Sequence, residues 1–162
     1  MNTTPNNDDF VDPLENYEPP TYADALEEAI CEQTASKVQH EPFTTIPASA
    51  TVEAAVKKLA GDHLAGLMVE EDGKLVGLFT NREVLNKVAL EPDVLAQPVR
   101  EVMTTDPVYV REDDPVAAAL CVMSVHGYRH VPILTANESI YGIISPQRIT
   151  NFLIQYVFAS EA

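Results

Sequence analysis

Two short stretches of the chain place a hydroxyl side chain three residues before a charged one. GLFTNREV at 77–84 has Thr80 followed by Glu83, and GIISPQRI at 142–149 has Ser145 followed by Arg148. A carboxylate accepts hydrogen bonds, whereas a guanidinium carries five donors and no acceptor. The two stretches therefore share one pattern but offer opposite chemistry to a ligand, and we do not expect two equivalent binding sites.

These stretches belong to a longer internal repeat. A shift of 64 residues aligns TVEAAVKKLAG (51–61) with PVAAALCVMSV (115–125), and a shift of 65 aligns Gly77 with Gly142. Self-similarity at a fixed spacing indicates repeated structural units. Each unit is too small to bury a large core alone, so we expect the two to pack face to face and share one core. The predicted division is a tail at 1–20, a helix at 21–36, a first unit at 37–97 and a second unit at 98–160.

Each unit is predicted to fold as β-α-β-β-α. Apolar residues at helical spacing predict helices at 51–61 and 115–126, with Ser49 and Asp113 as candidate N-caps. The Asp72-Gly73 pair between apolar runs predicts a hairpin. The remaining predicted elements are first strands at 44–46 and 108–110, a polar turn at 136–139, and closing helices at 81–90 and 146–158, the last with Pro146 in its first position.

The segment before the repeat is acidic. No Lys or Arg precedes Lys37, and the Pro- and Asp-rich residues 1–20 cannot bury enough apolar surface to order themselves. They are a solubilising tail or a docking segment. A helix is predicted at 21–36, because Thr21 and Asp24 resemble a capping box. Its apolar stripe is expected to pack on the repeat module or on a second copy of the chain: Tyr22, Leu26, Ala29 and Ile30.

Composition narrows the function further. A formal net charge of −15 argues against a nucleic-acid polymer as partner, because phosphate binding needs clustered Lys and Arg. It also disfavours anionic membrane surfaces, and no apolar run reaches the ~20 residues that cross a bilayer. We expect a cytoplasmic protein. The two cysteines have no metal-ligand or disulfide spacing, and Cys121 is predicted to be a buried apolar side chain.

The motifs resemble those of the CBS-domain family, in the form of a tandem pair known as a Bateman module. The resemblance rests on their order and duplication: DGKLVGLFTNREV (72–84), VREVMTTDPVYV (99–110), GYRHVPIL (127–134) and GIIS (142–145). It implies an α+β fold of two repeats packed with pseudo-two-fold symmetry, and a homodimer. It also implies an adenosine-type regulatory ligand, such as AMP, ADP, ATP or S-adenosylmethionine, with no required cofactor and no metal.

The resemblance also implies ligand-binding residues. Thr80 and Ser145 stand where the family's hydroxyl residue opens a helix near phosphate, and a helix N-terminus favours an anion. Glu83 stands where an Asp takes the ribose diol, while Arg148 departs from that pattern. Arg129 and His130 in RHVPI add donors for phosphate. There are simpler alternatives. Thr80 and Ser145 would only cap helices, Arg148 would form a surface salt bridge, and Arg129 and His130 would only cover the edge of the cleft.

Two functions follow. The first is a ligand-sensing regulatory module that signals in trans to an effector protein, and not an enzyme, because no nucleophile–base motif or glycine-rich phosphate loop is found. The second is a ligand-free dimerisation and protein-interaction scaffold with the acidic N-terminal segment as docking arm. On the second view, removal of residues 1–35 is expected to leave thermal stability nearly intact.

Overall fold

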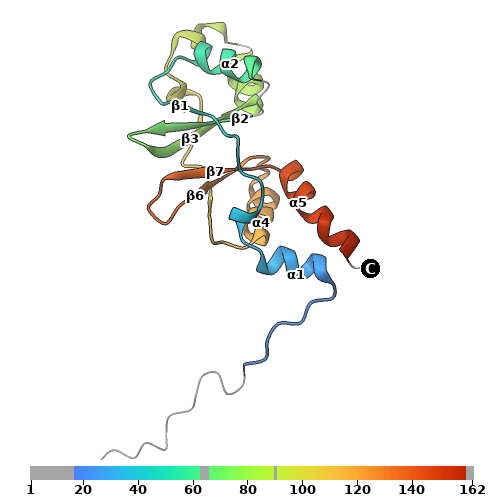
Figure 1. The fold of residues 1–162 in the computed structure, drawn as a ribbon. Helices are drawn as coiled ribbons and strands as arrows, with labels where there is room; N and C mark the ends of the chain where they lie inside the picture. Colours follow the sequence, from blue (N-terminus) through green and yellow to red (C-terminus); the bar gives the residue numbers. More distant parts are fainter. Residues whose placement is uncertain (1–16, 63–65, 90, 160–162) are drawn as a thin grey trace, which may run out of the picture.

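The computed structural model describes residues 17–62, 66–89 and 91–159. Two β-α-β-β-α units follow an N-terminal helix, as predicted from the repeat, and Figure 1 shows them stacked with β3 beside β7 at the middle of the molecule. The elements are α1 (Ala25–Glu32), β1 (Thr45–Pro47), α2 (Val52–Gly61), β2 (Gly66–Glu71), β3 (Lys74–Thr80), α3 (Asn81–Glu83), β4 (Thr104–Thr105), β5 (Val110–Arg111), α4 (Val116–His126), β6 (Val131–Leu134), β7 (Ile140–Ile144) and α5 (Pro146–Ala159).

The two sheets have the same local topology. In the first sheet, ordered β1-β2-β3-β4, β1 runs parallel to β2 and β2 antiparallel to β3. In the second, ordered β5-β6-β7, β5 runs parallel to β6 and β6 antiparallel to β7. Asp72 and Gly73 form the predicted hairpin turn, with φ of 51° and 77°, the positive values that a tight two-residue turn requires. The α+β fold class is confirmed.

Each sheet is completed by the segment that leads into the other unit. Thr104 of β4 pairs with Leu78 of β3, although the chain then continues into the second unit. In the second sheet, the Ile143 amide donates to the carbonyl of His40, 3.2 Å away, at the start of the first unit. Thr104 and His40 are separated by the repeat spacing of 64 residues. The sheets therefore extend across the predicted division at residues 97 and 98.

The crossing segments explain the paired glycines. A Cβ atom on Gly77 would lie 2.2 Å from the sulfur of Met103, and one on Gly142 would lie 2.6 Å from the Cβ of His40. At Gly142 the close atoms include the backbone carbonyl oxygen of His40 at 2.9 Å, so a side chain there would push the crossing segment off the strand. At Gly77 they all belong to the Met103 side chain, which would have to move aside. Both copies of the repeat have glycine at this position because, in both units, a segment crossing between the units packs directly on it.

The apolar interior consists of three clusters instead of the single shared core that we expected. One fills the first unit around Phe79 and Leu67, and one fills the second around Ile133 and Ile144. A third and smaller cluster joins the sheets through Met68, Leu78 and Ile143. The backbone explains the difference, because each unit closes its own helices over one face of its sheet. Only the other face of each sheet is left to contact the other unit, through the small third cluster.

Three predicted caps are wrong. The N-cap of α2 is Thr51, whose hydroxyl accepts from the Ala54 amide at 3.2 Å, and not Ser49. The N-cap of α4 is Pro115, which has no side-chain acceptor, and not Asp113. The N-cap of α1 is Asp24, so this helix begins four residues after the predicted start at residue 21. Asp24 and Thr51 directly precede the first turns of α1 and α2, so their side-chain oxygens reach a free backbone amide there.

Two of the predicted helices differ from the structure. The helix predicted at 81–90 is a single α-turn, α3, followed by a π-helix at Val84–Val88. The helix predicted at 21–36 ends at Glu32, and a short 3-10 helix follows at Ala35–Lys37. By contrast, α5 begins at Pro146 as predicted. None of the described helices is long and apolar enough to span a bilayer.

Helix α1 packs on the second unit. It lies against α4 and α5 (Figure 1), with Ala29 buried. The chain after it is held to the start of α4, because the Val116 amide donates to the Gln33 carbonyl at 2.8 Å. Cys121 on α4 is exposed and not buried as predicted. The reason is that α4 is apolar on every side, so composition alone did not reveal which face turns inward.

Candidate functional site at the junction of the two units

A pocket with a volume of about 430 Å³ lies where the two units meet. The first unit contributes the end of β3, α3 and the residues after it, together with β4. The second unit contributes the segment between α4 and β6. The lining residues are Leu78, Thr80, Asn81, Arg82, Glu83, Leu85, Asn86, Thr104, Tyr128, Arg129 and His130.

Glu83 forms the buried polar centre of this pocket wall. Its side chain is 4% exposed, and one carboxylate oxygen accepts from both the amide and the hydroxyl of Thr80, at 2.9 and 2.6 Å. The other oxygen accepts from the Thr104 hydroxyl at 2.9 Å. Thr80 in turn accepts from the Arg82 amide at 3.2 Å, which completes a capping box. Glu83 therefore ties α3 to β4, the strand that leads to the second unit.

Arg82 connects the pocket wall directly to the second unit. Its guanidinium donates to the carbonyl of Gly127 at 2.6 Å. Gly127 is the C-cap of α4 and has φ of 64°, a left-handed conformation that glycine adopts without steric cost. Arg82, one of the two residues between the hydroxyl and the acid of the repeated motif, thus bridges the two units.

His130 and Arg129 form the opposite wall. His130 is half-buried and faces Gly66, where an added Cβ atom would lie 3.6 Å from the imidazole. Burial lowers the pKa of His130, and the positive charges of Arg148 and Arg129 lower it further. Arg129 is exposed, and no hydrogen bond or ion pair to it is found within the described residues.

Arg148 and Ser145 lie outside this pocket, at the corresponding place in the second unit. The Arg148 guanidinium donates to the carbonyl of Ile143 at 2.7 Å and to that of Pro42 at 2.6 Å. Ser145 accepts from the Arg148 amide at 3.4 Å, as a helix cap does. Arg148 therefore ties the start of α5 to the crossing segment at the start of the first unit, as Glu83 ties α3 to β4. No salt bridge to it is found among the described residues.

Four of the six predicted site residues are thus gathered in one pocket: Thr80, Glu83, Arg129 and His130. Sequence reasoning missed seven other lining residues, five of which lie inside the motifs quoted above. These five are Leu78, Asn81, Arg82, Thr104 and Tyr128, whereas Leu85 and Asn86 follow directly after the first motif. No cluster of metal-binding side chains occurs in the described part of the chain.

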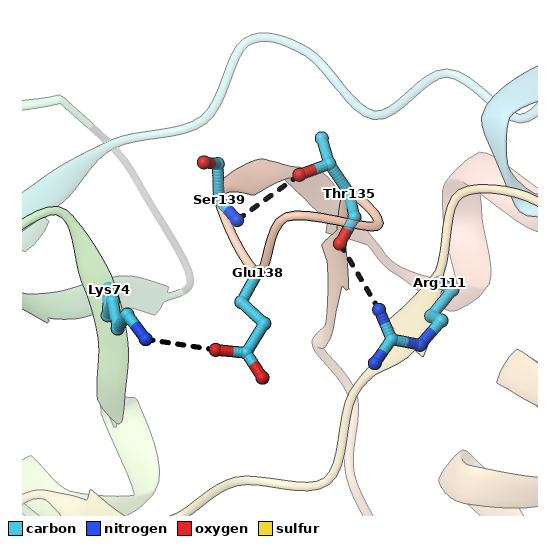
Figure 2. Close-up of polar contacts among 5 residues, drawn as sticks. All are labelled: Lys74, Arg111, Thr135, Glu138 and Ser139. Carbon is cyan, nitrogen blue, oxygen red and sulfur yellow. Dashed lines mark hydrogen bonds and ion pairs between the residues drawn. The ribbon is translucent and has the colours of Figure 1, made fainter.

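The units are also joined at the hairpin tips, at the other end of β3 from the pocket. Figure 2 shows the Lys74 ammonium beside the Glu138 carboxylate, 3.0 Å away. Glu138 has φ of 63°, at the position that Gly73 occupies in the first unit. The turn that carries it is held by the Ser139 amide, which donates to the Thr135 hydroxyl at 3.2 Å. The pocket is therefore framed by contacts between the units at both ends of β3.

Comparison with protein families gives a match over most of the chain. The model of the CBS domain matches twice, at residues 35–90 and 99–155. A 17.7 kDa protein of Acidianus ambivalens is 33% identical over 120 residues, which are 74% of this chain and 72% of that protein. The homoserine O-acetyltransferase of Methanosarcina acetivorans is 28% identical over 122 residues, which are 75% of this chain but 22% of the enzyme.

Solved structures agree with this assignment. The CBS domain protein PAE2072 from Pyrobaculum aerophilum, solved with AMP, superposes with a TM-score of 0.66 at 24% identity, over 77% of this chain and 98% of that one. The CBS domain pair of MJ0100, solved with 5′-methylthioadenosine and S-adenosylmethionine, gives 0.65 at 21% identity, over 80% and 98%. At these identities the likeness establishes the fold. Together with the two matches to the family model, it shows that this chain belongs to the CBS-domain family as a tandem pair.

Proposed function

We propose that the chain is a regulatory module that binds an adenosine-type nucleotide in the pocket at the junction of the two units. The observation that carries this proposal is the pocket itself. Its volume of about 430 Å³ lies within the ~300–1,000 Å³ usual for small-molecule sites. Its lining comes from both units, so a ligand there contacts both at once.

The lining suits a nucleotide. Leu78, Leu85 and Tyr128 supply apolar and aromatic surface for a purine ring, and the amides of Asn81 and Asn86 supply both donors and acceptors. The solved CBS pairs from Pyrobaculum aerophilum and MJ0100 contain adenosine compounds, which supports the same ligand class here. The role is that of a binding module, in which binding energy is used for regulation and not for a reaction.

Regulation follows from the position of the pocket. A ligand that bridges the units stabilises the arrangement that it fits best and shifts the population toward it. Arg82 already links the pocket wall to the end of α4, and α4 carries α1. In this proposal the signal passes in trans, through a homodimer or an effector protein that contacts the second unit.

Calorimetry and thermal unfolding test the proposal. AMP, ADP, ATP and S-adenosylmethionine are titrated into the full chain, and at least one is expected to bind and to raise the melting temperature. Ligand at 100 times its Kd stabilises by about 2.7 kcal/mol. The pocket variant Tyr128→Ala should weaken binding, whereas Tyr109→Ala, outside the pocket and 38% exposed, should not. No heat and no thermal shift with all four compounds contradicts the proposal.

A ligand-free scaffold remains the second candidate, because the charged groups of both motifs are bonded within the chain. Glu83 accepts from Thr80 and Thr104, and Arg148 donates to two backbone carbonyls. On this view the acidic face of α1 is the docking surface: Glu27, Glu28 and Glu32. Pull-down with a triple Gln variant of these residues tests it, and unchanged partner capture would argue against it.

A further inference from the structure

The charge of the pocket is the reverse of the charge of the chain. The whole sequence has 25 Asp and Glu against 10 Lys and Arg. The pocket is lined by two arginines, Arg82 and Arg129, against a single carboxylate, that of Glu83. A local excess of cations in a strongly acidic protein concentrates anionic ligands at that place.

The single carboxylate is not free to hold a ligand. Glu83 is 4% exposed and accepts three hydrogen bonds, two from Thr80 and one from Thr104. Turning it toward a ribose diol would leave the half-buried hydroxyls of both threonines without their acceptor, which costs free energy. Ribose recognition by this side chain therefore competes with the contact that joins α3 to β4.

The cations, by contrast, retain free donors. Arg82 uses one donor on the Gly127 carbonyl and keeps the others of its guanidinium. Arg129 is exposed and, within the described part of the chain, has no hydrogen-bonding partner. The two arginines come from opposite units, and both line the same cavity.

From this distribution we infer that the pocket discriminates among nucleotides by the charge of the phosphate chain and not by the ribose. Nucleoside di- and triphosphates should bind more tightly than nucleosides without phosphate, and the sulfonium cation of S-adenosylmethionine should bind weakly. A hydrogen bond to a charged group contributes about ten- to a hundredfold in affinity. The inference rests on the proposed function for the adenosine part of the ligand only.

Isothermal titration of the full chain tests this with ATP, AMP, 5′-methylthioadenosine and inorganic tripolyphosphate. ATP is expected to bind at least tenfold more tightly than 5′-methylthioadenosine. Arg129→Gln should weaken ATP at least tenfold and leave 5′-methylthioadenosine nearly unchanged. Arg100→Gln is the matched control, because it removes an exposed arginine that pairs with Glu71 outside the pocket. Both variants are first compared with the wild type by thermal unfolding.

The outcomes separate the two proposals. Equal affinities for ATP and 5′-methylthioadenosine, or an equal loss of both in Arg129→Gln, would overturn the inference while leaving the adenosine site intact. If tripolyphosphate binds in an Arg129-dependent manner and no adenosine compound binds better, the phosphate inference stands and the adenosine proposal fails. Binding of 5′-methylthioadenosine without any binding of tripolyphosphate supports the adenosine site and contradicts the phosphate inference.

Discussion

At the scale of single residues, one repeated position has two different uses. Glu83 accepts from Thr80 and Thr104, and Arg148 donates to the carbonyls of Ile143 and Pro42. The sequence was sufficient to predict that one is an acceptor and the other a donor. It was not sufficient to predict that the chain itself satisfies both, because Thr104 and Pro42 lie far away in sequence. Their approach depends on the crossing segments.

Glu83→Ala tests the structural use of this position. It leaves the Thr80 and Thr104 hydroxyls without their acceptor, and each hydrogen bond to a charged group contributes about 1.5–3 kcal/mol. We expect the free energy of unfolding, measured with urea, to fall by at least about 1.5 kcal/mol. Glu53→Ala is the matched control, because it removes an exposed glutamate from the first turn of α2. A Glu83→Ala variant as stable as that control would contradict the network.

His130 should make stability depend on pH. Its pKa in the folded chain is below the ordinary 6.5, first because of burial and then because of Arg148 and Arg129. Below about pH 6.5 the unfolded chain takes up a proton that the folded chain does not, so the free energy of unfolding falls as the pH falls through this window. Above it, both states are neutral and no penalty remains.

The measurement is the free energy of unfolding between pH 5 and 8 for the wild type and His130→Gln. The wild type should lose stability relative to this variant as the pH falls below 6.5. His126→Gln, which removes an exposed imidazole, controls for the loss of a histidine elsewhere. Parallel curves for the wild type and His130→Gln would show that burial at this site has no such effect.

At the scale of elements, periodic segments were predictable and short pairings were not. The helix predicted at 51–61 is found at Val52–Gly61, since its apolar spacing is a local property. Strand β4 has two residues and no periodicity; it exists because the crossing segment meets the free edge of β3. The break between α3 and the π-helix was also missed. There Lys87 donates to the carbonyl of Val102 at 2.7 Å, a tertiary contact.

The position of α1 leads to a prediction that differs from the sequence-based one, in which removal of residues 1–35 leaves stability nearly intact. In the structure, Ala29 and Ala35 are buried against the second unit, and Val116 donates to Gln33. Removal of residues 1–36 should therefore cost about 2 kcal/mol or more, a fall of about 4–8 °C in melting temperature.

Calorimetric melting of two truncations checks this. The shorter one lacks residues 1–16, so every contact described above is retained, and it should melt like the full chain. The longer one lacks residues 1–36 and should melt at a lower temperature. If both truncations melt together, α1 contributes no stability and its packing on α4 and α5 is dispensable.

At the scale of the whole molecule, three contacts within the described residues join the two units in addition to the crossing segments. The small cluster of Met68, Leu78 and Ile143 lies between the sheets, the Lys74–Glu138 pair joins the hairpin tips, and Arg82 reaches the end of α4. The duplicated motif predicted a pocket between two similar halves. It did not predict that the pocket lies beside the first motif, at Glu83, and not beside the second, at Arg148. That outcome depends on how the surrounding side chains pack.

The helical surface of the second unit leads to a prediction about assembly. Helix α4, VAAALCVMSVH, contains no Asp, Glu, Lys or Arg, yet its buried residues are Val116 and Ala119 alone. Val125 is 78% exposed. A helix that is apolar on all sides normally lies inside a protein or an interface, so we expect α4 to be covered by a second copy of the chain.

Light scattering of the full chain should therefore give the mass of a dimer, and Val125→Glu should shift it to the monomer, because a charge cannot be buried unpaired in an apolar contact. Leu85→Glu is the matched control: it places the same charge on a leucine that is 68% exposed but lines the pocket. This variant should keep the dimer mass. A monomeric wild type, or a dimer that survives Val125→Glu, would mean that α4 is not the surface on which the copies meet.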